Sequence, residues 1–336
     1  MKLLIKISAL VTIFSILLLG CRSAENTTTT EEPPLEPLSL PQLSAVSLDN
    51  RPLKVVATTS IIGDIVGRVG GDAIDLTILI GPGQDSHSYE PSTGDLTAAA
   101  DADVIFINGW NLEESLITNL ENVIGDAPLV PVAAGITPLP FSGHDEHGAN
   151  AEYEEHSSAD PHTWTDPHLV VQWVDNISQT LAALDPANAE LYQQNTADYQ
   201  TELQSLIQYY DEQVATLPAE KRVMVTNHDS FGYFAHAYNF EIIGTVLAGV
   251  STLSEPSADD LANLVDTMEQ AGICTIFAET SANQTLAETI AAELDSCENV
   301  QVISLYTESI GAPASGDDSY TAMMRANIDA IVNGLQ

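Results

Sequence analysis

Four residues spread along the chain have side chains that could together hold a transition-metal ion. They are two histidines in the first half, His87 and His162, and a histidine and a glutamate in the second half, His228 and Glu308. Three imidazole nitrogens and one carboxylate oxygen would give zinc a complete four-coordinate site. A single loop histidine is more often solvated or caps a turn. The prediction therefore depends on whether the fold brings all four together.

Three acidic residues near these candidates could orient the imidazole rings. Glu90 follows the first histidine closely, Asp229 follows the third directly, and Glu279 ends an apolar run. A carboxylate that accepts a hydrogen bond from the second ring nitrogen of a metal ligand fixes the tautomer and orientation of the ring. Helix capping is the alternative for Glu90 and Asp229, and a structural hydrogen bond is the alternative for Glu279.

A long polar loop over 141–159 carries further histidines among acidic residues. These histidines are His144, His147 and His156. Such a loop could trap cations weakly as an auxiliary metal site, and a solvated acidic loop is the alternative. We assign His168 and His236 to packing or to the surface.

From Lys54 onward, short apolar runs alternate with helical patterns, which predicts βα units around parallel sheets. We expect strands over 54–59, 74–80, 104–108, 129–132, 222–226, 240–246, 274–279 and 300–306. We expect helices over 61–69, 95–100, 112–120, 169–184, 258–271, 286–294 and 320–335. In open α/β sheets, ligands bind beyond the carboxyl ends of the strands, where His87, His228 and Glu308 are expected.

One long helix is predicted over 185–217. Asp185 is a good N-cap, Pro186 suits the first helical position, and apolar residues then recur every three or four positions until Pro218. At ~1.5 Å per residue this helix would be roughly 45 Å long. The expected fold is α/β, with two parallel-sheet sandwich domains over 52–184 and 218–336 joined by this rigid helix. The candidate ligands, two from each half, would then meet in a cleft between the domains.

The first 21 residues have the pattern of an export signal. Lys2 and Lys6 precede an apolar run over 7–19, which is too short for a comfortable membrane span, and Leu-Leu-Gly then leads into Cys21. This ending resembles a bacterial lipobox, in which Cys21 would be lipidated; a plain signal peptide with an incidental cysteine is the alternative. Residues 22–51 are rich in proline and threonine, which predicts a flexible tether. We therefore expect an exported protein that is lipid-anchored to the outer face of the cytoplasmic membrane.

Charge and cysteine content narrow the possibilities further. The 336 residues include 48 acidic and 9 basic ones, a net charge of −39 that would repel nucleic acid. In an oxidising compartment, Cys274 and Cys297 are first interpreted as a disulfide, since each lies just before an apolar run. Two buried free thiols are the alternative, and metal binding by the pair is less favoured.

Four segments resemble, in order, the metal-ligand motifs of the zinc- and manganese-binding lipoproteins of bacterial ABC importers. They are residues 84–91, 160–167, 226–234 and 306–311, and residues 320–327 match the family's closing helix. The resemblance runs from about Leu53 to the C-terminus. It implies two sandwich-like domains joined by a rigid helix, with the metal between them. It also implies a monomeric, non-catalytic protein that delivers its metal ion to a membrane permease.

The resemblance does not determine which metal ion the protein binds. The family usually has aspartate where this chain has Glu308, so one or two oxygens could ligate, or water could complete the site instead. Relatives that resemble manganese carriers tend to place a carboxylate at the position of His228, and a third imidazole favours zinc (Zn²⁺) over manganese (Mn²⁺). A manganese or iron carrier is the alternative within the family. A secreted zinc hydrolase is the alternative of another class, but Glu308 is expected to close the coordination position that catalysis needs, and no HExxH motif is present.

Overall fold

The computed structural model describes residues 35–140, 159–247, 249, 251–281 and 284–336. Cys21 and the loop histidines His144, His147 and His156 lie outside these residues. The first sheet contains β1 (Leu53–Thr59), β2 (Ile74–Ile80), β3 (Val104–Ile107) and β4 (Leu129–Pro131). The second contains β5 (Val223–Thr226), β6 (Glu241–Thr245), β7 (Thr275–Glu279) and β8 (Gln301–Leu305).

Both sheets are parallel throughout and share one topology. The strand orders are β2-β1-β3-β4 and β6-β5-β7-β8, so the second sheet repeats the first with every strand number raised by four. The predicted α/β fold with two parallel-sheet domains is therefore confirmed. The repeat places the carboxyl ends of corresponding strands where two similar sets of loops can form one site.

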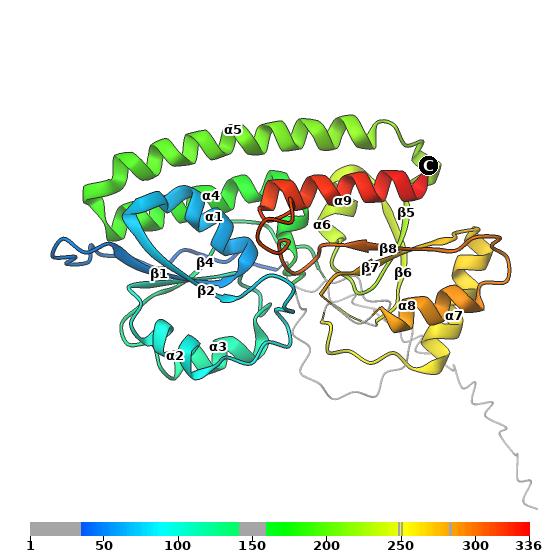
Figure 1. The fold of residues 1–336 in the computed structure, drawn as a ribbon, viewed down its shortest axis with the longest axis horizontal. Coiled ribbons are helices and arrows are strands. Elements are labelled where there is room, and N and C mark those ends of the chain that lie inside the picture. Colours follow the sequence, from blue (N-terminus) through cyan, green and yellow to red (C-terminus); the bar gives the residue numbers. More distant parts are fainter. Residues whose placement is uncertain (1–34, 141–158, 248, 250, 282–283) are drawn as a thin grey trace, which may run out of the picture. The chain divides into compact units, whose positions relative to one another are not determined.

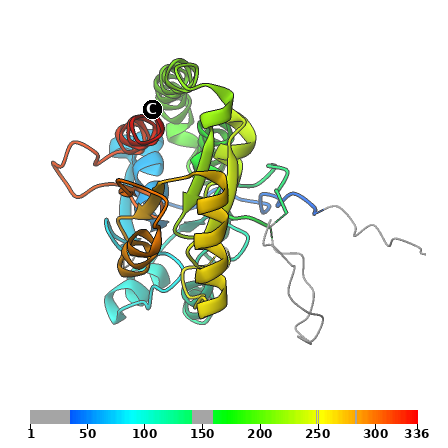
Figure 2. The same cartoon turned by 90° about the vertical axis from the view of Figure 1, so that its right-hand side faces the viewer.

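Helices cover both faces of the sheets (Figures 1 and 2). On one side lie α1 (Ser60–Gly70), α4 (Pro167–Leu184), α5 (Ala189–Val214) and α9 (Tyr320–Leu335). On the other side lie α2 (Thr93–Ala100), α3 (Glu114–Glu121), α7 (Ala258–Ala271) and α8 (Thr285–Glu293). The strands β1, β3, β5 and β7 inside the two sheets are thus almost entirely buried, whereas the edge strands β2, β6 and β8 keep exposed positions.

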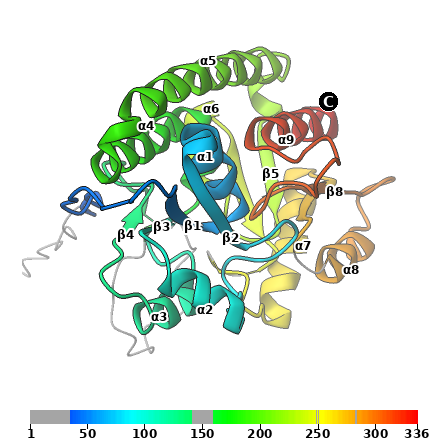
Figure 3. The ribbon, with the colours of Figure 1, turned by 60° about the vertical axis from the view of Figure 1, so that its left-hand side comes forward.

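The long helix α5 runs along both halves. It packs against α1 and α4 of the first domain and against α9 of the second (Figures 1 and 3). The α-helix begins at Ala189, after a 3-10 turn over Pro186–Asn188. The Asp185 carboxylate caps no backbone N–H in that turn; it accepts hydrogen bonds from the Tyr192 hydroxyl (2.9 Å) and the Asn188 amide (2.6 Å). The carboxylate therefore fastens the turn to the helix.

One apolar core extends through both domains. A single cluster of buried side chains includes residues of β1, α1 and α4 together with residues of α5, β7 and α9. Hydrogen bonds accompany this packing: the Tyr210 hydroxyl donates to the Met324 carbonyl oxygen (2.8 Å), and the Tyr209 hydroxyl donates to Asp329 (2.6 Å). Moving the domains far apart would expose part of this core to water, which is unfavourable in proportion to the apolar area exposed.

Two segments differ from expectation. The helix α6 (Gly232–Tyr238) is not predicted by the sequence, because seven residues are too few for a clear helical period. The described part of the segment expected to be a free tether is ordered against the first domain. Its apolar residues, Leu40, Leu43, Val46 and Leu48, pack on the core. Since the Val46 N–H also donates to the Leu184 carbonyl oxygen (2.8 Å), the expectation of a flexible tether reaching to residue 51 is wrong for these residues.

The described residues include both cysteines of the predicted disulfide and the helices that could be tested for a membrane span. Cys274 and Cys297 form a disulfide, with their Cα atoms 5.8 Å apart, which ties the start of β7 to the segment between α8 and β8. Within the described ranges, none of the helices has the length and apolar character needed to span a bilayer.

Candidate metal centre

His87 lies in the loop that follows β2. The Asp85 carboxylate holds this loop: it accepts hydrogen bonds from the His87 backbone N–H (3.0 Å) and the Ser88 hydroxyl (2.7 Å). It also accepts one from the Thr252 hydroxyl (2.6 Å), which belongs to the second domain. The His87 ring is buried, with 1% of the residue exposed. Its Nδ1 lies 3.6 Å from Glu114 Oε1, an ion-pair distance but too long for a hydrogen bond.

His162 precedes the short 3-10 turn over Thr163–Thr165 and is fully buried. Asp160 Oδ1 accepts hydrogen bonds from the His162 backbone N–H (2.9 Å) and from ring Nδ1 (2.8 Å). Because an ionised carboxylate can only accept, Nδ1 carries a proton, and Nε2 is the nitrogen left to face a metal. Burial disfavours the charged ring, but the carboxylates of Asp160 and Glu308 outweigh it and raise the pKa of His162 to about 9.

His228 follows β5 and is also fully buried. Glu279, the last residue of β7, contacts His228 Nδ1 through Oε1. Burial again disfavours the charged ring, but the carboxylates of Glu279 and Glu308 together outweigh it and raise the pKa of His228 well above its usual value. The neighbouring strands β5 and β7 thus supply a ligand and the carboxylate that orients it.

Glu308 follows β8 and is 1% exposed. Burial alone would raise the pKa of its carboxyl group, but the imidazoles of His162 and His228 hold that pKa well below the usual range. Glu308 is therefore ionised and facing two imidazoles, in a site from which water is nearly excluded. Such an anion is a strong ligand for a divalent cation.

The four side chains point their ligand atoms at one another. His162 Nε2 lies 3.4 Å from His87 Nε2 and 3.2 Å from His228 Nε2. Glu308 Oε1 lies 3.4 Å from His162 Nε2 and 3.5 Å from His228 Nε2. All the ligand atoms fall within 4.8 Å of one another. For zinc bonds of 2.0–2.1 Å, the edge of a coordination tetrahedron is roughly 3.3–3.4 Å. Four of the six spacings therefore match a tetrahedral ion, and the remaining pairs, which involve His87, lie within 4.8 Å.

The orienting carboxylates differ in part from those expected. Glu279 contacts a ligand histidine, whereas Glu90 is exposed and forms no hydrogen bond with any described residue, so its expected role is wrong. Asp229 is buried beside His228, and its backbone N–H donates to the Gly249 carbonyl oxygen (3.1 Å). Its role in orienting a ring stays a prediction.

Sequence reasoning missed the carboxylates beside the other two histidines. Asp160 could have been found, because an aspartate two residues before a histidine can accept hydrogen bonds from that residue's backbone and ring. Glu114 gives no comparable signal, since only the fold brings it near His87.

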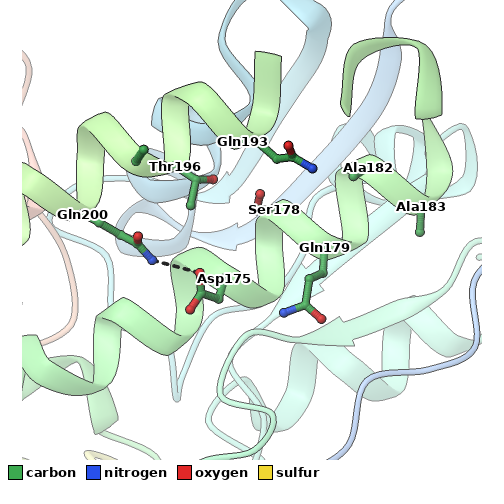
Figure 4. Close-up of a pocket in the computed structure, with 9 residues that line it drawn as sticks. Asp175, Ser178, Gln179, Ala182, Ala183, Gln193, Thr196 and Gln200 are labelled. Atoms are coloured by element: carbon green, nitrogen blue, oxygen red, sulfur yellow. Dashed lines mark hydrogen bonds between the residues drawn. The ribbon is translucent and has the colours of Figure 1, made fainter. Parts of the chain in front are cut away.

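A separate groove lies between α4 and α5 (Figure 4). Amide side chains and small residues line it, and Gln200 Nε2 donates to Asp175 Oδ1 (2.8 Å) across it. None of the four candidate ligands lines this groove. The metal chemistry of the described residues is therefore concentrated in the buried cluster between the two sheets.

Two parallel-sheet domains with a buried cluster of histidines and a carboxylate between them define a metal-binding protein. The chain matches the model of the family described as zinc-uptake complex component A, periplasmic, over residues 55–334. It belongs to this family, whose members are substrate-binding proteins of metal ABC transporters and not enzymes. The expected class is therefore confirmed, and the hydrolase alternative is wrong.

Named relatives differ in the metal they carry. The chain is 31% identical over 293 residues to the manganese-binding lipoprotein MntA of Halalkalibacterium halodurans, covering 87% of this chain and 91% of MntA. It is 31% identical over 291 residues to the manganese ABC transporter substrate-binding lipoprotein PsaA of Streptococcus pneumoniae, covering 84% of this chain and 89% of PsaA. The solved structure of the periplasmic zinc-binding protein TroA from Treponema pallidum superposes with a TM-score of 0.74 at 33% identity, covering 84% of this chain and 99% of TroA.

Proposed function

We propose that this protein captures zinc outside the cytoplasmic membrane and delivers it to the permease of an ABC importer. The observation that carries the choice of metal is the convergence of three imidazole nitrogens and one carboxylate oxygen, with four of their six spacings close to a tetrahedral edge. Zinc favours four ligands of these kinds, whereas manganese favours octahedral sites rich in oxygen. His87, His162, His228 and Glu308 would form the complete ligand set, which leaves no position for a reacting water.

Manganese is the second candidate, because MntA and PsaA are named as manganese proteins. A manganese site built from these residues would need more ligand atoms than the four described, so the second oxygen of Glu308 or water would have to join it. The two candidates therefore differ in coordination number as well as in metal.

We also propose that the protein is a monomer anchored through a lipid on Cys21. The sequence before Cys21 supports this, and several relatives are named lipoproteins. The core shared by the two domains makes a wide hinge motion costly, so metal release would use smaller shifts of loops or domains. Crystal structures with and without metal that differ by a large rigid rotation would contradict this mode of release.

The test is a competitive zinc and manganese titration, with elemental analysis, on the purified protein starting after Cys21. Zinc binds most nitrogen and oxygen sites more tightly than manganese does, so a simple preference for zinc decides little. The informative comparison is with His228→Glu, which makes the site richer in oxygen. We expect one zinc per wild-type chain and a ratio of zinc to manganese affinity that falls at least about tenfold in the variant. An unchanged ratio, or retention of manganese in preference to zinc by the wild type, would contradict the zinc assignment.

A further inference from the structure

The loop that carries Glu308 is bonded to the first domain at four consecutive residues. Trp164 Nε1 donates to the Thr307 carbonyl oxygen (2.8 Å), and the Ser86 hydroxyl donates to Glu308 Oε2. The Gly83 N–H donates to the Ser309 hydroxyl (2.8 Å), and the Ile310 N–H donates to the Ser60 hydroxyl (3.3 Å). The first domain therefore fixes the position of a ligand that belongs to the second.

The two carboxylate oxygens of Glu308 have different surroundings. Oε2 accepts the hydrogen bond from Ser86, which is 1% exposed and directly precedes His87. Oε1 has no hydrogen-bond partner among the described residues and faces His162 Nε2 (3.4 Å) and His228 Nε2 (3.5 Å). Only Oε1 is thus both free and directed at the metal position.

We propose that Ser86 sets the specificity of the site by holding Glu308 to one ligating oxygen. The inference rests on the proposed metal-binding function and adds a positioning residue to it. With Oε2 bound to a hydroxyl, the protein supplies four ligand atoms, which suits a tetrahedral ion. With Oε2 released, both oxygens could bind, and the site would accept ions that favour five or six ligands.

The free-energy cost of a buried carboxylate oxygen without a partner favours these separate roles of Oε1 and Oε2. A buried carboxylate oxygen without a hydrogen bond is costly, so Oε2 stays with Ser86 while that donor is present. When the donor is removed, the nearest way to satisfy Oε2 is the metal itself.

The test compares Ser86→Ala with Ser88→Ala. Ser88 is on the same loop but is exposed, and its hydroxyl donates to Asp85 instead of to a candidate ligand. Without it, Asp85 still accepts the hydrogen bonds from the His87 N–H and the Thr252 hydroxyl that hold the loop. Each purified protein is loaded with cobalt(II), whose visible absorption is intense in four-coordinate sites and weak in six-coordinate ones. The zinc and manganese affinities of each variant are measured by competition.

We expect an intense four-coordinate spectrum for the wild type and for Ser88→Ala. In Ser86→Ala the absorption should weaken, and the ratio of zinc to manganese affinity should fall by about tenfold, the size expected for one hydrogen bond to a charged group. Ser86→Thr, which keeps the hydroxyl, should restore both properties. An unchanged spectrum and ratio in Ser86→Ala would overturn the proposal.

The wild-type spectrum keeps the proposal testable even if Ser86→Ala does not fold. One bound cobalt with a five- or six-coordinate spectrum would overturn the role of Ser86 while leaving metal binding intact. A wild-type protein that binds no cobalt, zinc or manganese would overturn the proposed function as well.

Discussion

The sequence Asp-Pro-His occurs twice, six residues apart, and the two copies form the same pair of hydrogen bonds. In the first, Asp160 Oδ1 accepts hydrogen bonds from the His162 backbone N–H (2.9 Å) and ring Nδ1 (2.8 Å). In the second, Asp166 Oδ1 accepts the same two bonds from His168 at the same distances. The sequence therefore determines the carboxylate–imidazole pair locally, wherever the pair lies in the fold.

The two copies differ in the surroundings of the histidine ring on the side away from the aspartate. His162 is fully buried, and its Nε2 faces two other imidazoles and Glu308. The His168 side chain is 49% exposed and lies near Tyr238, with 6.0 Å between ring centroids. An oriented histidine therefore becomes a candidate ligand only when other parts of the chain supply the remaining ligand atoms.

The two Asp-Pro-His copies should differ most in the loss of zinc affinity that follows when the histidine of each is replaced by alanine. We expect His162→Ala to weaken zinc binding by more than about a hundredfold, because loss of a direct ligand should exceed the 10–100-fold effect of losing an orienting partner. His168→Ala should leave zinc affinity unchanged. Competition with a chelator of known affinity measures both. Equal losses in the two variants would show that His168 also holds the metal.

The next largest loss of zinc affinity is expected when Asp160, the carboxylate that orients His162, is replaced. We expect Asp160→Asn to weaken zinc binding by about 10–100-fold, because the amide cannot hold the Nδ1 proton as strongly as a carboxylate does. The same chelator competition applies, and Asp166→Asn is the matched control. An Asp160→Asn variant with wild-type affinity would mean that packing alone orients His162.

Replacing Asp166, the carboxylate of the second copy, should lower the free energy of unfolding and leave zinc binding unchanged. Asp166 is the N-cap of α4 and accepts a hydrogen bond from the His168 N–H. We expect Asp166→Ala to lower the free energy of unfolding of the metal-free protein by about 0.5–2 kcal/mol, with no change in zinc affinity. Denaturant unfolding measures the first, and Asp166→Asn, another good N-cap, should unfold almost like the wild type. A binding defect in Asp166→Ala would contradict the assignment of this copy to structure alone.

The smallest effect is expected for the free energy of unfolding of His168→Ala. Its ring is half-exposed and makes no contact with the candidate ligands in the described residues. We expect a change within about ±0.5 kcal/mol, measured by the same denaturant unfolding. A loss well beyond this would assign His168 a packing role against Tyr238.

Much of the fold could be predicted because its elements repeat simple patterns. Continuous apolar runs predict each buried strand to within one or two residues, and the helices α7 and α9 begin and end where their periodicity does. The short α6 and the packed residues before β1 could not be predicted, because their structure depends on contacts with distant elements.

Some residues of the candidate site could likewise be predicted from the sequence, and others could not. The four ligands could be proposed because each follows a strand or opens a helix, and because their motifs resemble those of a known family. Closeness in sequence misled the prediction for Glu90, whose loop turns it outward. Glu114 and Ser86 act on residues far along the chain or in the other domain, so their contacts emerge only from the fold.

The most direct test of the central claim is a crystal structure of the zinc-loaded protein with anomalous scattering at the zinc edge. We predict one zinc with four ligands, His87 Nε2, His162 Nε2, His228 Nε2 and Glu308 Oε1, at distances near 2.0–2.2 Å. A zinc ion held elsewhere, or one bound by both oxygens of Glu308 or by water in place of one of these residues, would contradict the account.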